Sequence, residues 1–286
     1  METEGRVEHP SAAADGILAA TRWTFLCFAL ILVSAVAILW FQPAHTADRW
    51  AWTISPEITP VFMGSVYAAG AFVFVRLFAS RVWHPYAPVL IGAIVLTTLL
   101  LLATLIHFDR FNHGDGPLPA DVAFYGWVGI YALAPPWITW LWWRNRGADP
   151  GDSGVGVRVP ARVRASAAVI GALAAVAAAV MWLWPAGVAD VWPWLLTPLT
   201  ARVLASYVAT IAVLGLVLSR DGRWSSWRPT VQTLLVFDVI LLIGSLRRTG
   251  DFEGGVATGA YFASLAAALV FLVALISVLE GRRFRP

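Results

Sequence analysis

Trp50-Ala51-Trp52-Thr53-Ile54-Ser55-Pro56 has a counterpart 142 residues later, Trp192-Pro193-Trp194-Leu195-Leu196-Thr197-Pro198. Each copy follows one long apolar segment and precedes another. The match extends on both sides of the two stretches, with offsets of 142 and then 141 residues, and its last pair is Phe111 with Phe252. Because Trp and Pro are scarce, their ordered recurrence indicates an internal repeat. We therefore expect two versions of one structural unit.

The composition is typical of a membrane protein. Hydrophobic residues make up 59% of the 286 residues and charged residues 13%, whereas a soluble domain is about a quarter charged. Mean hydropathy is +0.72. Continuous apolar runs long enough to cross a bilayer of about 30 Å predict α-helices, and they lack the alternation of a membrane β-barrel. Eight such runs are expected, at 18–41, 56–79, 87–107, 122–143, 165–184, 198–219, 229–246 and 257–279.

These runs divide the chain into two membrane-embedded units. A polar tail (1–17) precedes the first four-helix repeat (18–146), and a Gly-, Asp- and Pro-rich linker (147–160), expected to be flexible and cytoplasmic, leads to the second repeat (161–286). An even number of helices per unit keeps the direction of the chain. The predicted fold is therefore an all-α membrane protein of two parallel repeats, with pseudo-twofold symmetry along the membrane normal.

The basic residues predict the orientation. All 20 are arginine, a bias that indicates a GC-rich bacterial genome, and 15 of them fall on the side of the bilayer that carries both termini. That asymmetry predicts a multi-pass protein of the bacterial inner membrane with cytoplasmic termini. The expected partners are the lipid bilayer and other membrane subunits or further copies of the chain. A formal charge of +3 does not indicate a nucleic-acid partner.

The repeated stretch itself has a structural interpretation. Its paired tryptophans are expected in an aromatic belt at the outer surface, and the hydroxyls of Ser55 and Thr197 are expected to cap the helices that follow. The alternative is a symmetric lid over an outward-facing cavity. Elsewhere, Pro135-Pro136 predicts a kink or break in the fourth helix, and the Ala-rich run 165–180 predicts close helix packing.

Asp238 lies in the middle of the seventh apolar run, where an ionised carboxylate costs about 2.5–3.5 kcal/mol to insert. Its counterpart in the first repeat is Thr97, so the two repeats differ in charge at this position. Tyr67, Ser206 and Tyr207 are expected at a similar depth and are candidate partners. Together these residues form a candidate substrate or ion-coupling site. The alternative is a neutral acid that hydrogen-bonds a neighbouring helix.

The outer connections carry two further candidate sites. His107, Asp109 and His113, with Glu57 nearby, have side chains that suit a divalent metal, although their spacing matches no known site pattern. A second candidate is contact with an anion or lipid headgroup through Arg110, Arg202, Arg247 and Arg248. A charged, solvated loop accounts equally for both groups. No cofactor is predicted beyond the optional metal.

The sequence favours no single reaction. The absence of a Walker loop, a His-Glu-x-x-His motif and a Gly-x-Ser-x-Gly motif weakens ATPase, protease and esterase interpretations. The leading hypothesis is a small transporter or permeation protein with a site between the repeats. The alternatives are a non-enzymatic membrane subunit or assembly partner, and an outer-face lipid-modifying enzyme that uses His107, Asp109 and Glu57.

Overall fold

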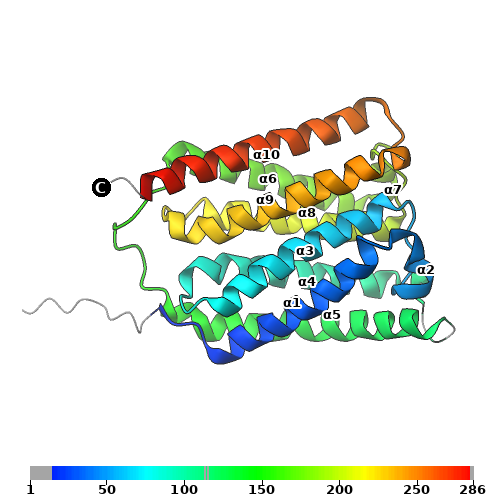
Figure 1. Cartoon of the computed structure of the whole chain (residues 1–286), viewed down its shortest axis with the longest axis horizontal. Helices are drawn as coiled ribbons and strands as arrows, with labels where there is room; N and C mark the ends of the chain where they lie inside the picture. The colour runs from blue at the N-terminus through cyan, green and yellow to red at the C-terminus, as the bar shows by residue number, and fades with distance from the viewer. Residues whose placement is uncertain (1–14, 113, 115, 284–286) are drawn as a thin grey trace, which may run out of the picture.

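The computed structural model describes residues 15–112, 114 and 116–283, and in these ranges every regular element is helical (Figure 1). The long helices match the expected apolar runs: α1 Ala19–Leu39, α3 Ile58–Ala79, α4 Ala87–Ile106, α5 Leu118–Asn145, α6 Ala161–Leu183, α8 Pro198–Leu218, α9 Trp224–Arg247 and α10 Gly255–Arg283. Short helices fill the connections: α2 Thr46–Arg49, α7 Pro185–Ala189, and the 3₁₀ turns η2 Pro43–His45, η3 His84–Tyr86, η4 Phe108–Arg110, η5 Arg146–Ala148 and η6 Thr249–Asp251.

Seven helices of the described chain are long and apolar enough to cross a membrane, namely all the long helices except α5. With 28 residues, α5 also exceeds the roughly 20 residues that a span requires. Its tryptophans, tyrosines and prolines lower its mean hydropathy. The fold is that of a helical, multi-pass membrane protein.

The long helices lie in two layers (Figure 1). One layer runs α1, α3, α9, α10, and the other runs α5, α4, α8, α6, with each helix packed against its neighbours in that order. Each layer therefore combines two helices from residues 18–146 with two from residues 161–286. Between the layers the central helices touch only sparsely, since α3 meets α8, and α4 meets α9, through few residues.

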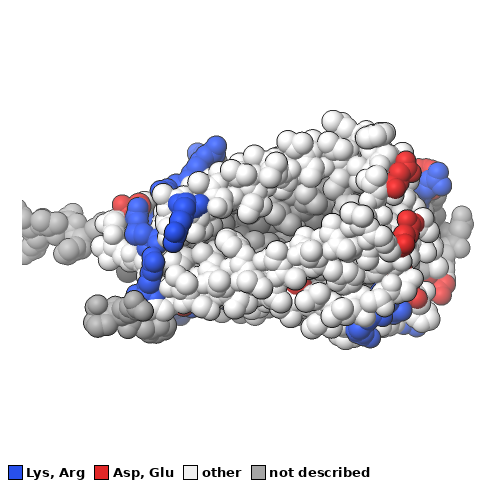
Figure 2. Space-filling view, turned by 90° about the horizontal axis from the view of Figure 1, so that it is seen from above, with Lys and Arg blue, Asp and Glu red and all other residues white. Residues whose placement is uncertain are grey.

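The two ends of the bundle differ in charge. The linker, the start of α1 and the end of α10 lie at one end, here called the linker end, while α2 and α7 lie at the other, the α2–α7 end (Figure 1). Figure 2 shows basic side chains predominating at the linker end, on the left, and mixed acidic and basic ones at the α2–α7 end. The surface between the ends is almost uncharged, as a bilayer requires.

Backbone contacts recur at the two expected offsets. At the α2–α7 end, the Asn112 N–H donates to the Ala51 carbonyl at 2.8 Å, and the Glu253 N–H donates to the Pro193 carbonyl at 3.0 Å. At the linker end, an isolated bridge joins Gly16 to Val82 and another joins Arg158 to Arg223. In each pair of contacts, the two segments joined in the first half of the chain correspond to the two segments joined in the second half.

The prediction of an aromatic belt at the outer surface is wrong for three tryptophans. Trp50, Trp52 and Trp194 are only 7%, 2% and 0% exposed. The segment after α2 turns inward, so that Trp50 and Trp52 pack against Trp127 of α5 with ring centroids 5.8 and 4.9 Å apart. Burial of a large indole inside the protein removes it from the lipid interface.

Only one of the two expected helix caps forms. Thr197 is the N-cap of α8 and makes a reciprocal capping box with Thr200, which confirms that prediction. The prediction for Ser55 is wrong, because α3 begins at Ile58 after a cis Ser55–Pro56 bond. The N–H of Ile58 instead donates to Oδ2 of Asp251 at 2.7 Å. A distant carboxylate thus caps α3 from the second half of the chain.

Two predictions about helix packing have different outcomes. The Ala-rich α6 packs closely on α8, where a Cβ added to Gly215 would lie 2.9 Å from the Ala167 carbonyl oxygen. Close packing of the small residues is therefore confirmed. Pro135 and Pro136 do not break α5, which continues through them to Asn145. The Thr139 hydroxyl donates to the Pro135 carbonyl at 2.7 Å, one turn back along the same helix.

Candidate functional site

A cavity of about 980 Å³ lies between the two layers. Helices α1, α3, α4, α5, α8, α9 and α10 all contribute to its wall, and the lining is overwhelmingly apolar. Figure 2 looks onto the edge where α10 and α6 lie and shows the surface hollowed there, between the charged ends. The cavity therefore lies at the depth of the hydrocarbon region.

The opposite edge of the cavity lies between α1 and α5. Ile31 of α1 and Val122 of α5 both line the cavity and are 40% and 63% exposed. Toward the linker end these helices are joined, because Asn145 donates to the Thr21 hydroxyl at 2.8 Å and Trp137 donates to the Thr24 hydroxyl at 3.1 Å. Toward the other end α2 packs on α5. Between these two sets of contacts, the cavity opens sideways along the α1–α5 edge.

Three tyrosines place hydroxyl groups at the cavity wall. Tyr67 of α3 and Tyr131 of α5 share a hydrogen bond of 3.0 Å between their hydroxyls. Tyr207 of α8 is 3% exposed, and its hydroxyl interacts with that of Tyr67. All three line the cavity. Tyr67 and Tyr207 were expected from the sequence, whereas Tyr131 was missed because its depth could not be set from the α5 sequence.

The other expected members of this site lie elsewhere. Ser206 donates to the Arg202 carbonyl of its own helix at 2.8 Å and does not line the cavity. Asp238 is 3% exposed, and its Oδ2 atom has no hydrogen-bond partner among the described residues. Its neighbours Phe237 and Leu241 line the cavity, but Asp238 itself does not. The coupling role of Asp238 remains a prediction.

Three side chains with N–H groups line the cavity near the α2–α7 end. Arg49 is the single charged side chain in the described lining, and it donates to the Gln42 side chain. Trp50 and Trp192 also line the cavity, and their buried indole N–H groups have no acceptor within the described ranges. None of the three was a predicted binding residue. The sequence did contain a signal for Arg49, because the residue 142 positions later is the uncharged Val191.

Residues of the two halves meet at the α2–α7 end. Arg202 of α8 donates to Nε2 of His107 at 2.7 Å, and Arg248 forms an ion pair with Glu57 at 2.6 Å. Partial burial, and then the nearby Arg202 guanidinium, lower the pKa of His107. His107 is therefore neutral at pH 7 and accepts the hydrogen bond.

The metal hypothesis gains no geometric support. Over the described residues, no group of three or more His, Cys, Asp or Glu side chains is placed to hold a metal ion. His107 is engaged by Arg202, and Asp109 is exposed and pairs with Arg110 at 3.2 Å. His113 lies outside the described residues.

Each expected anion-binding arginine has its own protein contact. Arg110, Arg202 and Arg248 pair with Asp109, His107 and Glu57, and the Arg247 guanidinium lies 4.9 Å from the ring centroid of Trp40. These contacts do not gather the four side chains around one point. Headgroup contact by them remains a prediction.

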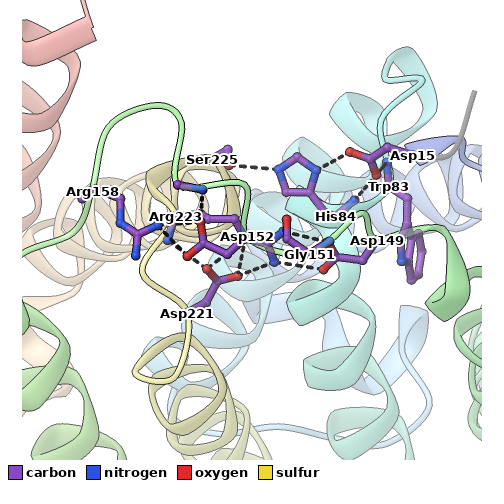
Figure 3. Close-up of polar contacts among 11 residues, drawn as sticks. Asp15, Trp83, His84, Asp149, Gly151, Asp152, Arg158, Asp221, Arg223 and Ser225 are labelled. Carbon is purple, nitrogen blue, oxygen red and sulfur yellow. Dashed lines mark hydrogen bonds and ion pairs between the residues drawn. The ribbon is translucent and has the colours of Figure 1, made fainter. Parts of the chain in front are cut away.

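A polar network at the linker end joins the linker to the connections of both halves (Figure 3). Arg223 donates to Asp149 at 2.7 and 2.9 Å, to Asp221 at 2.8 Å and to the Gly151 carbonyl at 3.0 Å. Hydrogen bonding from Arg223 lowers the pKa of Asp149. The sequence predicted a flexible linker, but this network attaches its first residues to the α8–α9 connection.

His84 forms a second part of this network. Its Nδ1 atom contacts Asp15, and its Nε2 atom lies 2.9 Å from the Ser225 hydroxyl (Figure 3). His84 and Ser225 lie 141 residues apart, which is one of the two offsets at which the sequence pattern recurs. Neither residue was a predicted site residue.

No family model, curated protein or solved structure matches the chain.

Proposed function

We propose that the chain is a small transporter or permeation protein of the bacterial inner membrane, with its site in the cavity between the two layers. The single observation that carries this proposal is the cavity of about 980 Å³, which lies between helices of both halves at the depth of the bilayer. A close-packed interface would have favoured a structural subunit. Sites between related halves are the usual arrangement in transporters.

The proposal includes a duplicated architecture with a pseudo-twofold axis along the membrane normal. Its support is the recurrence of equivalent contacts: α3 packs on α9 as α8 packs on α4, and the backbone contacts of the connections recur at offsets of 141 and 142. Contact between His84 and Ser225, themselves 141 residues apart, is expected where such an axis passes. In this scheme α5, the counterpart of α10, is an eighth span.

The proposed orientation places the linker end in the cytoplasm. Support comes from the basic side chains that predominate at that end (Figure 2), because cytoplasmic segments carry the excess of arginine. Both termini are then cytoplasmic, and the α2–α7 end faces outward. Labelling of a single cysteine at Val191 from the cytoplasm would overturn this orientation.

Transport requires the halves to move relative to each other at their ends. At the α2–α7 end they are held by the Arg248–Glu57 ion pair and by the Arg202–His107 hydrogen bond. At the linker end they are held by His84 with Ser225 and by Arg76 with Gln232. Two further hydrogen bonds, Ile58 N–H to Asp251 and Trp194 N–H to Thr59, also join the halves at the α2–α7 end. Because α3 packs on α9 and α4 on α8, movement of the halves must break these polar contacts and tilt the helices along the packed interfaces.

The test measures distances between the halves by pulsed electron paramagnetic resonance in lipid nanodiscs. Exposed Cys27 is first replaced by serine. Spin labels are then placed in pairs at Asp109 and Val191 for the α2–α7 end, or at Arg81 and Arg220 for the linker end, all of which are exposed. We expect two distance populations at the α2–α7 end, with Glu57→Gln increasing the longer one.

The matched control is Glu253→Gln, which neutralises an exposed acid at the same end and should leave the populations unchanged. One narrow distance at each end, insensitive to Glu57→Gln, would refute the transporter. It would favour the alternative of a rigid membrane subunit or assembly partner.

A further inference from the structure

We propose that the cavity binds an anionic membrane lipid, which enters sideways from the bilayer and places its headgroup by Arg49 and its apolar chains between the two layers. This inference rests on the proposed function, because it names the substrate class of the same site. It commits to a lipid and not to a water-soluble anion.

The route of entry follows from the position of the openings. Both open edges of the cavity, one between α1 and α5 and the other beside α10, lie between the charged ends of the bundle. The polar contacts of Thr21 and Thr24 with α5 close the α1–α5 edge toward the linker end. A molecule that reaches the cavity through these edges comes from the hydrocarbon region, where lipids are the abundant solutes.

The length of the cavity suits an extended apolar chain. Its α3 wall runs from Phe62 to Phe74, which corresponds to about 18 Å along a helix. Gly126 of α5 also lines the cavity, and a Cβ added there would meet no atom within 4 Å. The space beside this glycine is open to a ligand.

The polar groups of the lining predict an acceptor-rich headgroup. Arg49 presents an exposed guanidinium near the α2–α7 end, whereas the indole N–H groups of Trp50 and Trp192 are buried in the cavity wall. Arg49 has a neutral side-chain partner, Gln42, and no described carboxylate forms an ion pair with it. A phosphate group supplies both the negative charge and the acceptors.

Native mass spectrometry of the full chain tests the proposal. The probes are dioleoylphosphatidylglycerol, which is anionic, and dioleoylphosphatidylcholine, which carries the same chains and no net charge. We expect preferential binding of the anionic lipid. Arg49→Gln should weaken this preference about tenfold, the loss typical of one hydrogen bond to a charged group.

Two matched variants serve as controls. Trp52→Phe removes another buried, unpartnered indole N–H, but Trp52 does not line the cavity, so the preference should persist. Gly126→Leu should reduce binding of both lipids by filling the chain site. Gly129→Leu, on the same helix with open space but outside the cavity lining, should not.

Equal binding of the two lipids by the unmodified protein, or a preference that survives Arg49→Gln, would overturn the inference. So would equal lipid binding by the Gly126→Leu and Gly129→Leu variants. Displacement of the lipid by millimolar inorganic phosphate would indicate a free-anion site and would also overturn it. These results are separable from the distance measurements, because halves that move while the lipid fails to bind would refute only the lipid.

Discussion

The indole N–H of Trp194 donates to the hydroxyl of Thr59 at 2.9 Å, joining α3 to the segment before α8. The counterparts of these residues in the proposed repeat are Trp52 and Thr200, and they do not form this bond. The Trp52 N–H has no partner among the described residues, and Thr200 belongs to the capping box of α8. The same pair of residue types therefore joins the two halves on one side only.

We expect Trp194→Phe to destabilise the protein by about 1 kcal/mol, because it leaves a buried hydroxyl without its donor. Trp52→Phe removes an N–H that makes no bond and should cost less. Thermal unfolding in detergent, followed by near-ultraviolet circular dichroism, measures both variants. Equal losses would contradict the importance of the Trp194–Thr59 hydrogen bond.

Acid should weaken the α2–α7 end through His107. Burial and Arg202 lower the pKa of this histidine, so the unfolded chain binds the proton more readily than the folded protein does. The stabilisation that neutral His107 gives the folded protein is present above the unfolded pKa of about 6.5 and is lost as pH falls through the folded pKa. We therefore expect the midpoint temperature of thermal unfolding to be lower at pH 5 than at pH 8.

His107→Gln supplies the control for this pH dependence, since glutamine can still accept from Arg202 and does not titrate. The fall in midpoint should be smaller in this variant. An identical fall would assign the pH dependence to other groups.

Close packing of α6 on α8 depends on Gly215. A Cβ there would lie 2.9 Å from the Ala167 carbonyl oxygen, so Gly215→Ala should separate the helices at a cost of about 1–3 kcal/mol. Gly126→Ala, where the added carbon meets no atom within 4 Å, should be neutral or stabilising. Thermal unfolding midpoints of the two variants should therefore move in different directions, and a stable Gly215→Ala protein would contradict the close contact.

The buried carboxylate of Asp238 should destabilise the folded protein. Its Oδ2 atom has no partner in the described structure, and an ionised carboxylate inside a membrane-spanning helix costs about 2.5–3.5 kcal/mol, a cost that asparagine does not carry. We expect Asp238→Asn to preserve expression and to raise the thermal midpoint by a few degrees. If the residue also couples ion movement, the stabilised variant should lose transport in cells. Unchanged transport would refute the coupling role.

Attachment of the linker depends on Arg223. Its bonds to Asp149 and Asp221 should be lost in Arg223→Met, which should accelerate cleavage within 147–160 by a non-specific protease. Arg158→Met breaks a more exposed pair with Asp152 and should have a smaller effect, because exposed ion pairs contribute little. Equal cleavage of both variants would show that Arg223 does not hold the linker.

Local chemistry made the helices predictable. Continuous apolar runs must satisfy their backbone groups internally in lipid, so the segments of α1, α3, α4, α6, α8, α9 and α10 could be found in the sequence. The capping box of Thr197 followed from residue type and position. Ser55 has a similar residue type and position, yet the carboxylate of Asp251 took the capping role at α3.

Contacts between distant segments were decided only by the tertiary structure. Periodicity of 3.6 residues identifies a helix but not its neighbour, so the sequence did not reveal that α3 packs on α9 and α4 on α8. It placed Trp50, Trp52 and Trp194 in a lipid-facing belt, although the connections fold inward and bury them. Likewise Asp238, the conspicuous intramembrane charge, lies outside the cavity lining, while Arg49 and Tyr131 lie in it. The sequence by itself determined the membrane-embedded helices and the recurrence of the Trp-x-Trp stretch, because both depend on local residue order. The two-layer arrangement and its lateral cavity depend on which helix faces meet, and that is a property of the packed chain.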